Sequence, residues 1–189
     1  MKKRAFLFLN LILAASTFGA PGVSHSAEIV GFGNNCLDVS GGNRNNGAQL
    51  QMWECDGNNP NQQFSFENGL IVWNGTNKCL DVINGRNSNG TKIQVWDCDP
   101  RNRNQQWRLE RGGRIVWAGT NRCLDIDRGR TENGTRVHLW ECLSRNPSQA
   151  WTMNGGRRNR DRDRNYERPR DYERDRDRPR DYERDRVRN

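Results

Sequence analysis

The sequence predicts an all-β fold built from three copies of one repeat, related by pseudo-threefold symmetry. Three observations support this prediction. The cysteines Cys36, Cys79 and Cys123 recur at steps of 43 and 44 residues. Each copy carries short segments in which β-branched and aromatic residues alternate with polar ones, as in half-buried strands. An Asn-Gly pair recurs between the second and third segments, for example Asn89-Gly90, and favours a tight turn.

The middle copy shows the expected elements most clearly. Its four predicted strands lie at residues 71–73, 79–82, 93–96 and 106–109. No segment of the sequence shows the apolar stripe of an amphipathic helix. We therefore expect four strands in each copy and twelve in all. The copies span about residues 29–68, 70–111 and 114–154.

The number of copies restricts the architecture. One copy alone is too small to bury a core, whereas three together, at residues 28–154, form a domain of ordinary size. A closed propeller is excluded because it typically needs about four to eight blades. A pseudo-threefold β-trefoil of three four-stranded repeats remains.

The six cysteines predict three disulfides. They form pairs that are 19 residues apart in each copy, namely Cys36 with Cys55, Cys79 with Cys98, and Cys123 with Cys142. A zinc site is the competing interpretation, but the sequence has no CxxC motif and only two histidines, His25 and His138. An even number of cysteines in an exported chain favours disulfides. We expect neither a metal site nor a cofactor.

The first 27 residues have the features of a signal peptide. Lys2-Lys3-Arg4 precedes an apolar stretch at residues 5–15, and small residues follow up to Ala27. A membrane anchor is the alternative, but a spanning helix needs about 20 apolar residues. We expect cleavage between Gly22 and Ala27, no membrane span in the mature chain, and a secreted, periplasmic or cell-surface protein, typical of bacteria.

The composition changes abruptly after Asn154. Residues 155–189 consist mainly of Arg, Asp, Glu, Tyr and Pro, with Val187 as their one aliphatic residue, so we predict a disordered tail. The chain carries a net charge of +8, yet residues 28–154 hold 14 basic and 13 acidic residues. The basicity therefore belongs to the ends. The near-alternating charges of the tail do not favour nucleic-acid binding.

Three signals recur in register in the copies: Cys-Leu-Asp, a Gln or His two residues before a Trp, and Gln-x-aromatic. This pattern resembles the ricin-B-type β-trefoil lectins, the QxW repeat family, over about residues 29–153. The resemblance implies a carbohydrate-binding module that recognises glycans or polysaccharides. In this family each repeat can form a shallow sugar pocket.

The resemblance also implies which residues bind carbohydrate. The first copy supplies Asp38, Gln51, Trp53, Asn61 and Gln62. The second copy supplies Asp81, Gln94, Trp96, Asn104 and Gln105. The third copy supplies Asp125, His138, Trp140 and Gln149, and has Ser148 where the family usually has Asn. The aromatic residues of Gln-x-aromatic, Phe64, Trp107 and Trp151, are expected in the core, and the Gln residues of the motif are expected to belong to the hydrogen-bond framework rather than to contact the sugar directly.

The residue types suit the chemistry of a sugar. A carboxylate accepts hydrogen bonds from adjacent hydroxyls, amides add donors and acceptors, and the C–H face of a pyranose packs on a Trp ring. In every copy the Asp precedes the Gln or His by 13 residues, so a hairpin turn at Asn-Gly would place the two on neighbouring strands. We expect Asp81→Ala to weaken binding without lowering thermal stability much.

Two other classes of function are alternatives to sugar binding. A non-catalytic structural or interaction protein of the cell envelope would use the charged tail to bind anionic polymers, and this binding would fall steeply with salt. For an enzyme, the sequence shows no Cys–His pair that is expected to be free, no metal constellation, and no segment beyond the repeats large enough for a catalytic domain. We therefore predict no catalysis, although a separately encoded catalytic or toxin partner is compatible with the family.

Overall fold

The computed structural model describes residues 26–155. Residues 1–25 of the predicted signal peptide (1–27) and residues 156–189 of the predicted disordered tail (155–189) lie outside the described residues, while Ala27 and Gly155 belong to strands. Within residues 26–155, no helix has the length and apolar character needed to cross a membrane.

Twelve β-strands form in the described residues, four in each repeat. The first repeat contains β1 (Ala27–Val30), β2 (Asn35–Val39), β3 (Ala48–Glu54) and β4 (Phe64–Glu67). The second contains β5 (Leu70–Trp73), β6 (Lys78–Val82), β7 (Ile93–Asp97) and β8 (Trp107–Leu109). The third contains β9 (Ile115–Trp117), β10 (Arg122–Ile126), β11 (Thr135–Glu141) and β12 (Thr152–Gly155). Each predicted strand of the middle copy is confirmed to within one residue.

The segments between the strands contain short 3₁₀ turns, which were not predicted. Residues 26–155 hold seven of them, each three residues long, and no α-helix. One follows the second strand of each repeat: η2 (Ser40–Gly42), η4 (Ile83–Gly85) and η6 (Asp127–Gly129). Another follows the third strand: η3 (Pro60–Gln62), η5 (Arg103–Gln105) and η7 (Pro147–Gln149). The remaining one, η1 (Phe32–Asn34), lies between β1 and β2.

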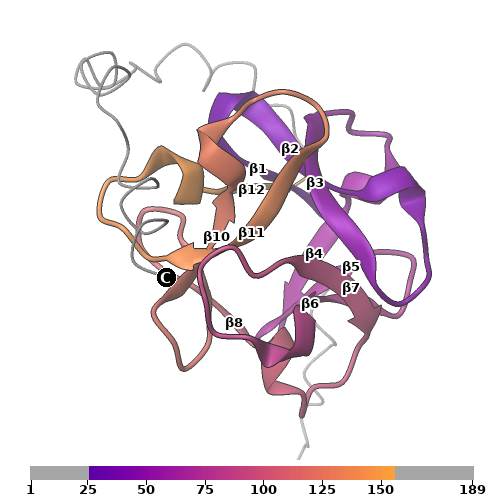
Figure 1. Ribbon diagram of the computed structural model, residues 1–189. Coiled ribbons are helices and arrows are strands. Elements are labelled where there is room, and N and C mark those ends of the chain that lie inside the picture. The colour runs from indigo at the N-terminus through magenta and orange to yellow at the C-terminus, as the bar shows by residue number, and fades with distance from the viewer. Residues whose placement is uncertain (1–25, 156–189) are drawn as a thin grey trace, which may run out of the picture.

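The strand pairing has pseudo-threefold symmetry. In each repeat the second and third strands form an antiparallel hairpin, β2–β3, β6–β7 and β10–β11. The fourth strand of one repeat pairs with the first strand of the next, as β4–β5 and β8–β9, and β12 pairs with β1 to close the ring. Figure 1 shows the hairpins in different colours along the chain, with β2 and β3 in violet and β10 and β11 in orange. The β-trefoil prediction is confirmed.

The Asn-Gly turns lie where the repeats meet. The first turn is closed by a hydrogen bond from Ala48 N to Asn45 O at 3.3 Å. Within it Gly47 has a φ of 94°, a conformation that glycine adopts at little cost. Only the glycine takes a positive φ, so the pair does not form the two-residue hairpin turn in which both residues would. Ala48 then pairs with Val95, which joins β3 to β7 of the next repeat.

The inward faces of the strands form one hydrophobic core. The aromatic residues of the three Gln-x-aromatic motifs are buried there, as predicted, with Phe64 0%, Trp107 2% and Trp151 4% exposed. The indole Nε1–H of Trp107 donates to Leu80 O at 3.0 Å, and that of Trp151 donates to Leu124 O at 3.0 Å. These bonds satisfy polar groups that burial would otherwise leave unpaired.

The three predicted disulfides are present, and no described cysteine is free. Each bridge joins the start of the second strand to the segment after the third strand, for example Cys36 to Cys55. The bridges therefore hold one end of each hairpin closed. The other end of each hairpin is the Asn-Gly turn.

Candidate functional site

An Asp lies opposite a Gln or His on the outer face of each hairpin. Asp38 pairs with Gln51 and Asp81 with Gln94 in the strand register, and Asp125 pairs with His138. The expected juxtaposition is confirmed. Gln51 Nε2 donates to Asp38 Oδ1 at 3.0 Å, and Gln94 Nε2 donates to Asp81 Oδ1 at the same distance. The alternate residues of β2, Leu37 and Val39, point the other way and are buried in the core.

The glutamines of the Gln-x-aromatic motifs support these carboxylates from below the surface. Gln62 Nε2 donates to Asp38 Oδ2 at 3.2 Å and to Glu54 O at 2.9 Å, while Gln62 Oε1 accepts from Asp56 N at 2.9 Å. Gln105 makes the same three contacts in the second repeat. Gln62, Gln105 and Gln149 are 0% exposed. All three lie beneath the surface, and Gln62 and Gln105 hold the aspartates of their repeats in place.

A third donor to each Asp was missed in the sequence. Asn59 Nδ2 donates to Asp38 Oδ2 at 3.4 Å, and the corresponding asparagines, Asn102 and Asn146, donate to Asp81 Oδ2 at 3.3 Å and Asp125 Oδ2 at 3.2 Å. Their Oδ1 atoms accept from the backbone N–H two residues later, at 3.0 to 3.1 Å, and cap the 3₁₀ turns. These asparagines recur at steps of 43 and 44 residues, a signal that comparison of the copies could have found.

The aspartates are nearly inaccessible. Asp38 and Asp81 are each 3% exposed, and Asp125 is 0% exposed. Burial raises the pKa of Asp38 and of Asp81 above the usual value, while the hydrogen bonds from the surrounding amides act in the opposite direction. A carboxylate has about four acceptor positions, so three amide donors leave about one for a ligand.

The burial of Asp81 changes the expected effect of its removal. Asp81→Ala would leave the amides of Gln94, Asn102 and Gln105 facing a position that has no acceptor. Unsatisfied buried donors reduce stability. From these contacts we expect the substitution to lower thermal stability, which revises the expectation from the sequence that it would spare it.

A tryptophan lies beside each Asp on the same face of the hairpin. Trp53 pairs with Cys36 in the strand register. On that face of the hairpin, the next pair is Asp38 with Gln51. Trp53 and Trp96 are each 42% exposed. Trp140 is half-buried, and its ring stacks on His138 with the ring centres 5.4 Å apart. The first two repeats therefore expose a flat apolar surface next to a carboxylate.

Asn61 and Asn104 complete the rim of the first two sites. Both side chains are half-buried, and neither has a hydrogen-bond partner among residues 26–155. A methyl group added at Gly42 would lie 2.7 Å from Asn61 Oδ1, and one at Gly85 would lie 2.7 Å from Asn104 Oδ1. The amides thus lie against the glycine turns η2 and η4, with free donors and acceptors.

We name the three candidate binding sites pockets 1, 2 and 3 by their repeats, and use the word for these groups of side chains. Pocket 1 consists of Asp38, Gln51, Trp53 and Asn61, and pocket 2 consists of Asp81, Gln94, Trp96 and Asn104. Pocket 3 consists of Asp125, His138 and Trp140.

Pocket 3 differs from the other two in its hydrogen bonds. His138 is 1% exposed, with Nε2 3.2 Å from Asp125 Oδ1, and its Nδ1 has no partner among the described residues. Gln149 Nε2 donates to Glu141 O at 2.8 Å, and among the described residues no hydrogen bond joins Gln149 to Asp125. Ser148, in place of the rim asparagine, is 2% exposed.

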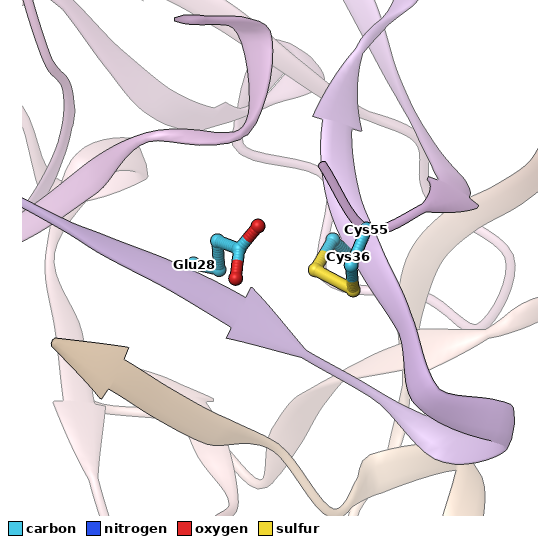
Figure 2. A group of neighbouring side chains, drawn as sticks. All are labelled: Glu28, Cys36 and Cys55. Atoms are coloured by element: carbon cyan, nitrogen blue, oxygen red, sulfur yellow. A yellow bond between two sulfur atoms is a disulfide. The ribbon is translucent and has the colours of Figure 1, made fainter. Parts of the chain in front are cut away.

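One cluster in the described chain has metal-ligand residue types. Figure 2 shows the carboxylate of Glu28 directed toward the disulfide between Cys36 and Cys55. The three ligand atoms lie within 4.8 Å of one another. The two sulfurs are bonded to each other, so neither is the thiolate that a metal would require. We assign this cluster no metal.

Residues 25–151 match the family model described as the ricin-type beta-trefoil lectin domain. A comparison with curated proteins finds no match.

The fold is similar to several solved structures. The designed threefold-symmetric protein ThreeFoil superposes with a TM-score of 0.63 at 25% identity, over 69% of this chain and 99% of that chain. The C-half of an earthworm R-type lectin, solved in complex with GalNAc, gives a TM-score of 0.60 at 20% identity, over 70% and 99%. A non-toxic homologue of type II RIPs from Momordica charantia, solved with α-methyl-D-galactoside, gives 0.58 at 19% identity, over 69% and 48%.

Proposed function

We propose that this chain, which belongs to the ricin-type β-trefoil lectin family, binds glycans through pockets 1 and 2. One observation supports the proposal most directly. Each of these pockets places a Trp that is 42% exposed on the same hairpin face as an Asp held by three amide donors. An apolar plane beside an anchored acceptor suits a sugar ring, which has a C–H face and an edge of hydroxyls.

In this proposal the residues of pocket 1 have different roles. A sugar hydroxyl donates to the remaining acceptor position of Asp38, and the C–H face of the ring packs on Trp53. The free amide of Asn61 contacts a neighbouring hydroxyl. Gln51 and Gln62 orient the carboxylate and do not contact the sugar. Asp81, Trp96 and Asn104 have the corresponding roles in pocket 2.

Pocket 3 contributes little to binding in this proposal. Trp140 is stacked on His138, and the half-buried amide of the rim is replaced by buried Ser148. A sugar in pocket 3 would lack two of the three contacts available in the other pockets.

The first sugars to test are galactose derivatives. The earthworm lectin was solved with GalNAc and the bitter gourd protein with a galactoside. The proposed setting is outside the cell or at its surface, because disulfides persist in oxidising compartments. The proposed role is binding without catalysis.

The test is retention of the full chain on immobilised galactose, together with a glycan array. The double variant Trp53→Ala, Trp96→Ala should lose retention that free methyl α-D-galactoside competes away. Trp140→Ala is the matched control and should be retained like the parent. Thermal melts should show that both variants remain folded, because the mutated rings of the double variant are exposed.

Two results would contradict the proposal. One is full, sugar-competable retention of the double variant. The other is retention of the parent that no arrayed glycan competes with and that disappears with increasing salt. The second result would favour the envelope interaction through the charged tail instead, because exposed charges are screened by salt.

A further inference from the structure

The Asn-Gly turn of the first repeat contacts the second repeat on both sides of Trp96. Gly47 N donates to Val95 O at 2.9 Å. Asn46 Oδ1 accepts from Asp97 N at 2.9 Å. Val95 and Asp97 are the residues immediately before and after Trp96 in β7. Two hydrogen bonds from another repeat therefore fix the backbone that carries the exposed ring of pocket 2.

The other two turns make the same contacts with the next repeat. Gly134 N donates to Met52 O at 2.9 Å and Asn133 Oδ1 accepts from Glu54 N at 2.7 Å, on the two sides of Trp53. Gly90 N donates to Leu139 O at 2.8 Å and Asn89 Oδ1 accepts from Glu141 N at 2.7 Å, on the two sides of Trp140. The contacts thus run from repeat 1 to 2, from 2 to 3, and from 3 back to 1.

The same turns also contact the strand that carries the Asp. Lys78, the first residue of β6, donates through Nζ to Asn46 Oδ1 at 2.7 Å, and Asn46 Nδ2 donates to Asp97 Oδ2 at 2.7 Å. In the other repeats, Arg122 Nη1 donates to Asn89 Oδ1 at 2.5 Å and Asn35 Nδ2 donates to Thr131 O at 2.6 Å. Lys78 pairs with Asp97 across the hairpin, so one turn contacts both strands of the next pocket.

We propose that Asn46 is a positioning residue for pocket 2 and Asn133 for pocket 1, so that each pocket is completed by a turn of another repeat. The exposed rings of Trp53 and Trp96 have protein contacts on part of their surface only, so their placement beside the Asp depends on the backbone. The hydrogen bonds from the turn hold that backbone on both sides. The inference rests on the proposed sugar-binding function of pockets 1 and 2.

The test uses two parent variants, each of which keeps one of the two pockets; we call them the pocket 1 and pocket 2 backgrounds. Trp96→Ala leaves pocket 1, and Trp53→Ala leaves pocket 2. In the pocket 1 background, Asn133→Ala should weaken binding of methyl α-D-galactoside about three- to tenfold, the effect of losing one hydrogen bond, and Asn46→Ala should not. In the pocket 2 background Asn46→Ala should weaken binding at least as much, because it loses three hydrogen bonds, and Asn133→Ala should not.

Two further variants separate positioning from general loss of stability. Asn89→Ala removes the same kind of contact beside Trp140, and should leave binding unchanged in both backgrounds. Asn133→Asp keeps the acceptor for Glu54 N and should restore pocket 1. Equal losses in both backgrounds, or no loss in either, would overturn the proposal.

A spectroscopic measurement tests the positioning independently of sugar binding. In the ¹H–¹⁵N NMR spectrum of the otherwise unmodified full chain, Asn46→Ala should shift the indole N–H resonance of Trp96 more than that of Trp53. Asn133→Ala should do the reverse. If the parent does not bind galactosides, the proposed function is wrong for these sugars. The shifts of the two indole resonances still test whether Asn46 and Asn133 position the Trp residues. Shifts without this crossed pattern would contradict it.

Discussion

Each of the two complete pockets has at its floor a carboxylate that accepts hydrogen bonds from separate segments of the chain. Asp81 accepts one hydrogen bond from Gln94 on the neighbouring strand, and one each from Asn102 and Gln105 in the segment after β7. The same side chain is therefore a structural acceptor and the proposed ligand of a sugar hydroxyl. These two roles can be separated by changing the charge without changing the shape.

Asp81→Ala and Asp81→Asn should differ in stability. Alanine leaves the surrounding donors without an acceptor, which should lower the free energy of unfolding by about 1–3 kcal/mol. Asparagine keeps one oxygen for Asn102 and Gln105, and the amide of Gln94 can rotate to accept from its new N–H. Its cost should be clearly smaller. Urea denaturation measures both values, and equal losses would contradict this account of the floor.

The pH dependence of pocket 2 follows from the raised pKa of Asp81. Because the ionised form accepts hydrogen bonds more strongly, binding by the Trp53→Ala variant should weaken as the pH falls through the pKa of Asp81, which burial raises above the ordinary value of 3.8. Stability should change in the opposite sense. The folded protein binds this proton more tightly than the unfolded chain, so the contribution of Asp81 to stability is greatest below pH 3.8 and falls as the pH rises through the raised pKa.

Titration calorimetry and thermal melts check both trends. They should cover about pH 3 to 7, the range in which carboxylates titrate. The control is Asp97, whose pKa is lowered by hydrogen bonds from Lys78 and Asn46. Its stabilisation is present above its ordinary pKa and is lost as the pH falls through the lowered value. Asp97→Asn should therefore leave the trend attributed to Asp81 intact. A binding curve that stays flat through this range would count against the ionised carboxylate as ligand.

At the scale of the elements, the aromatic position at the start of the fourth strand differs between the repeats without changing the fold. Phe64 begins β4, Trp107 begins β8, and Trp151 directly precedes β12. Trp107 and Trp151 each donate an indole hydrogen bond to a backbone carbonyl across the core. Phe64, at the same place in the first repeat, is equally buried and has no such donor. The strand thus forms with either ring.

Trp107→Phe tests this equivalence. The variant should fold, because Phe64 occupies the corresponding site in the first repeat, but Leu80 O loses the indole donor. We expect unfolding to become easier by about 1 kcal/mol from the hydrogen bond, with a further loss from the smaller ring. Chemical denaturation followed by circular dichroism gives the value. An unchanged midpoint would show that the bond contributes nothing.

For the whole molecule, closure of the three repeats fixes two similar pockets on one rigid domain. Two weak sites on one module bind a dense surface more tightly than either site alone, because the second contact is intramolecular. The turns also link the repeats in a ring, so each pocket depends on the presence of all three.

Avidity gives a prediction at this scale. Trp53→Ala should retain the affinity of pocket 2 for free methyl α-D-galactoside in solution. On a densely galactosylated surface the same variant should dissociate at least about ten times faster than the parent. Surface plasmon resonance at high and low ligand density measures both. If density has no effect on the ratio of the dissociation rates, the parent does not use two pockets at once.

The sequence by itself determined the repeat, the twelve strands and the three disulfides. Strand periodicity and turn chemistry are local properties of the sequence. Because this chain repeats them three times in register, they can be predicted without tertiary information. The juxtaposition of Asp38 and Gln51 followed for the same reason, because the 13-residue spacing and a hairpin turn place them opposite each other.

Only the tertiary structure decided which side chains are accessible. Sequence spacing treats Trp53, Trp96 and Trp140 alike, whereas the stacking of Trp140 on His138 depends on the packing of the third hairpin. The hydrogen bonds from Asn102 and Gln105 to Asp81 depend on a loop that returns to the strand. The contact of Asn46 with the next repeat arises only when the ring closes. Exposure and contacts between repeats are properties of the assembled fold, and no local pattern contains them.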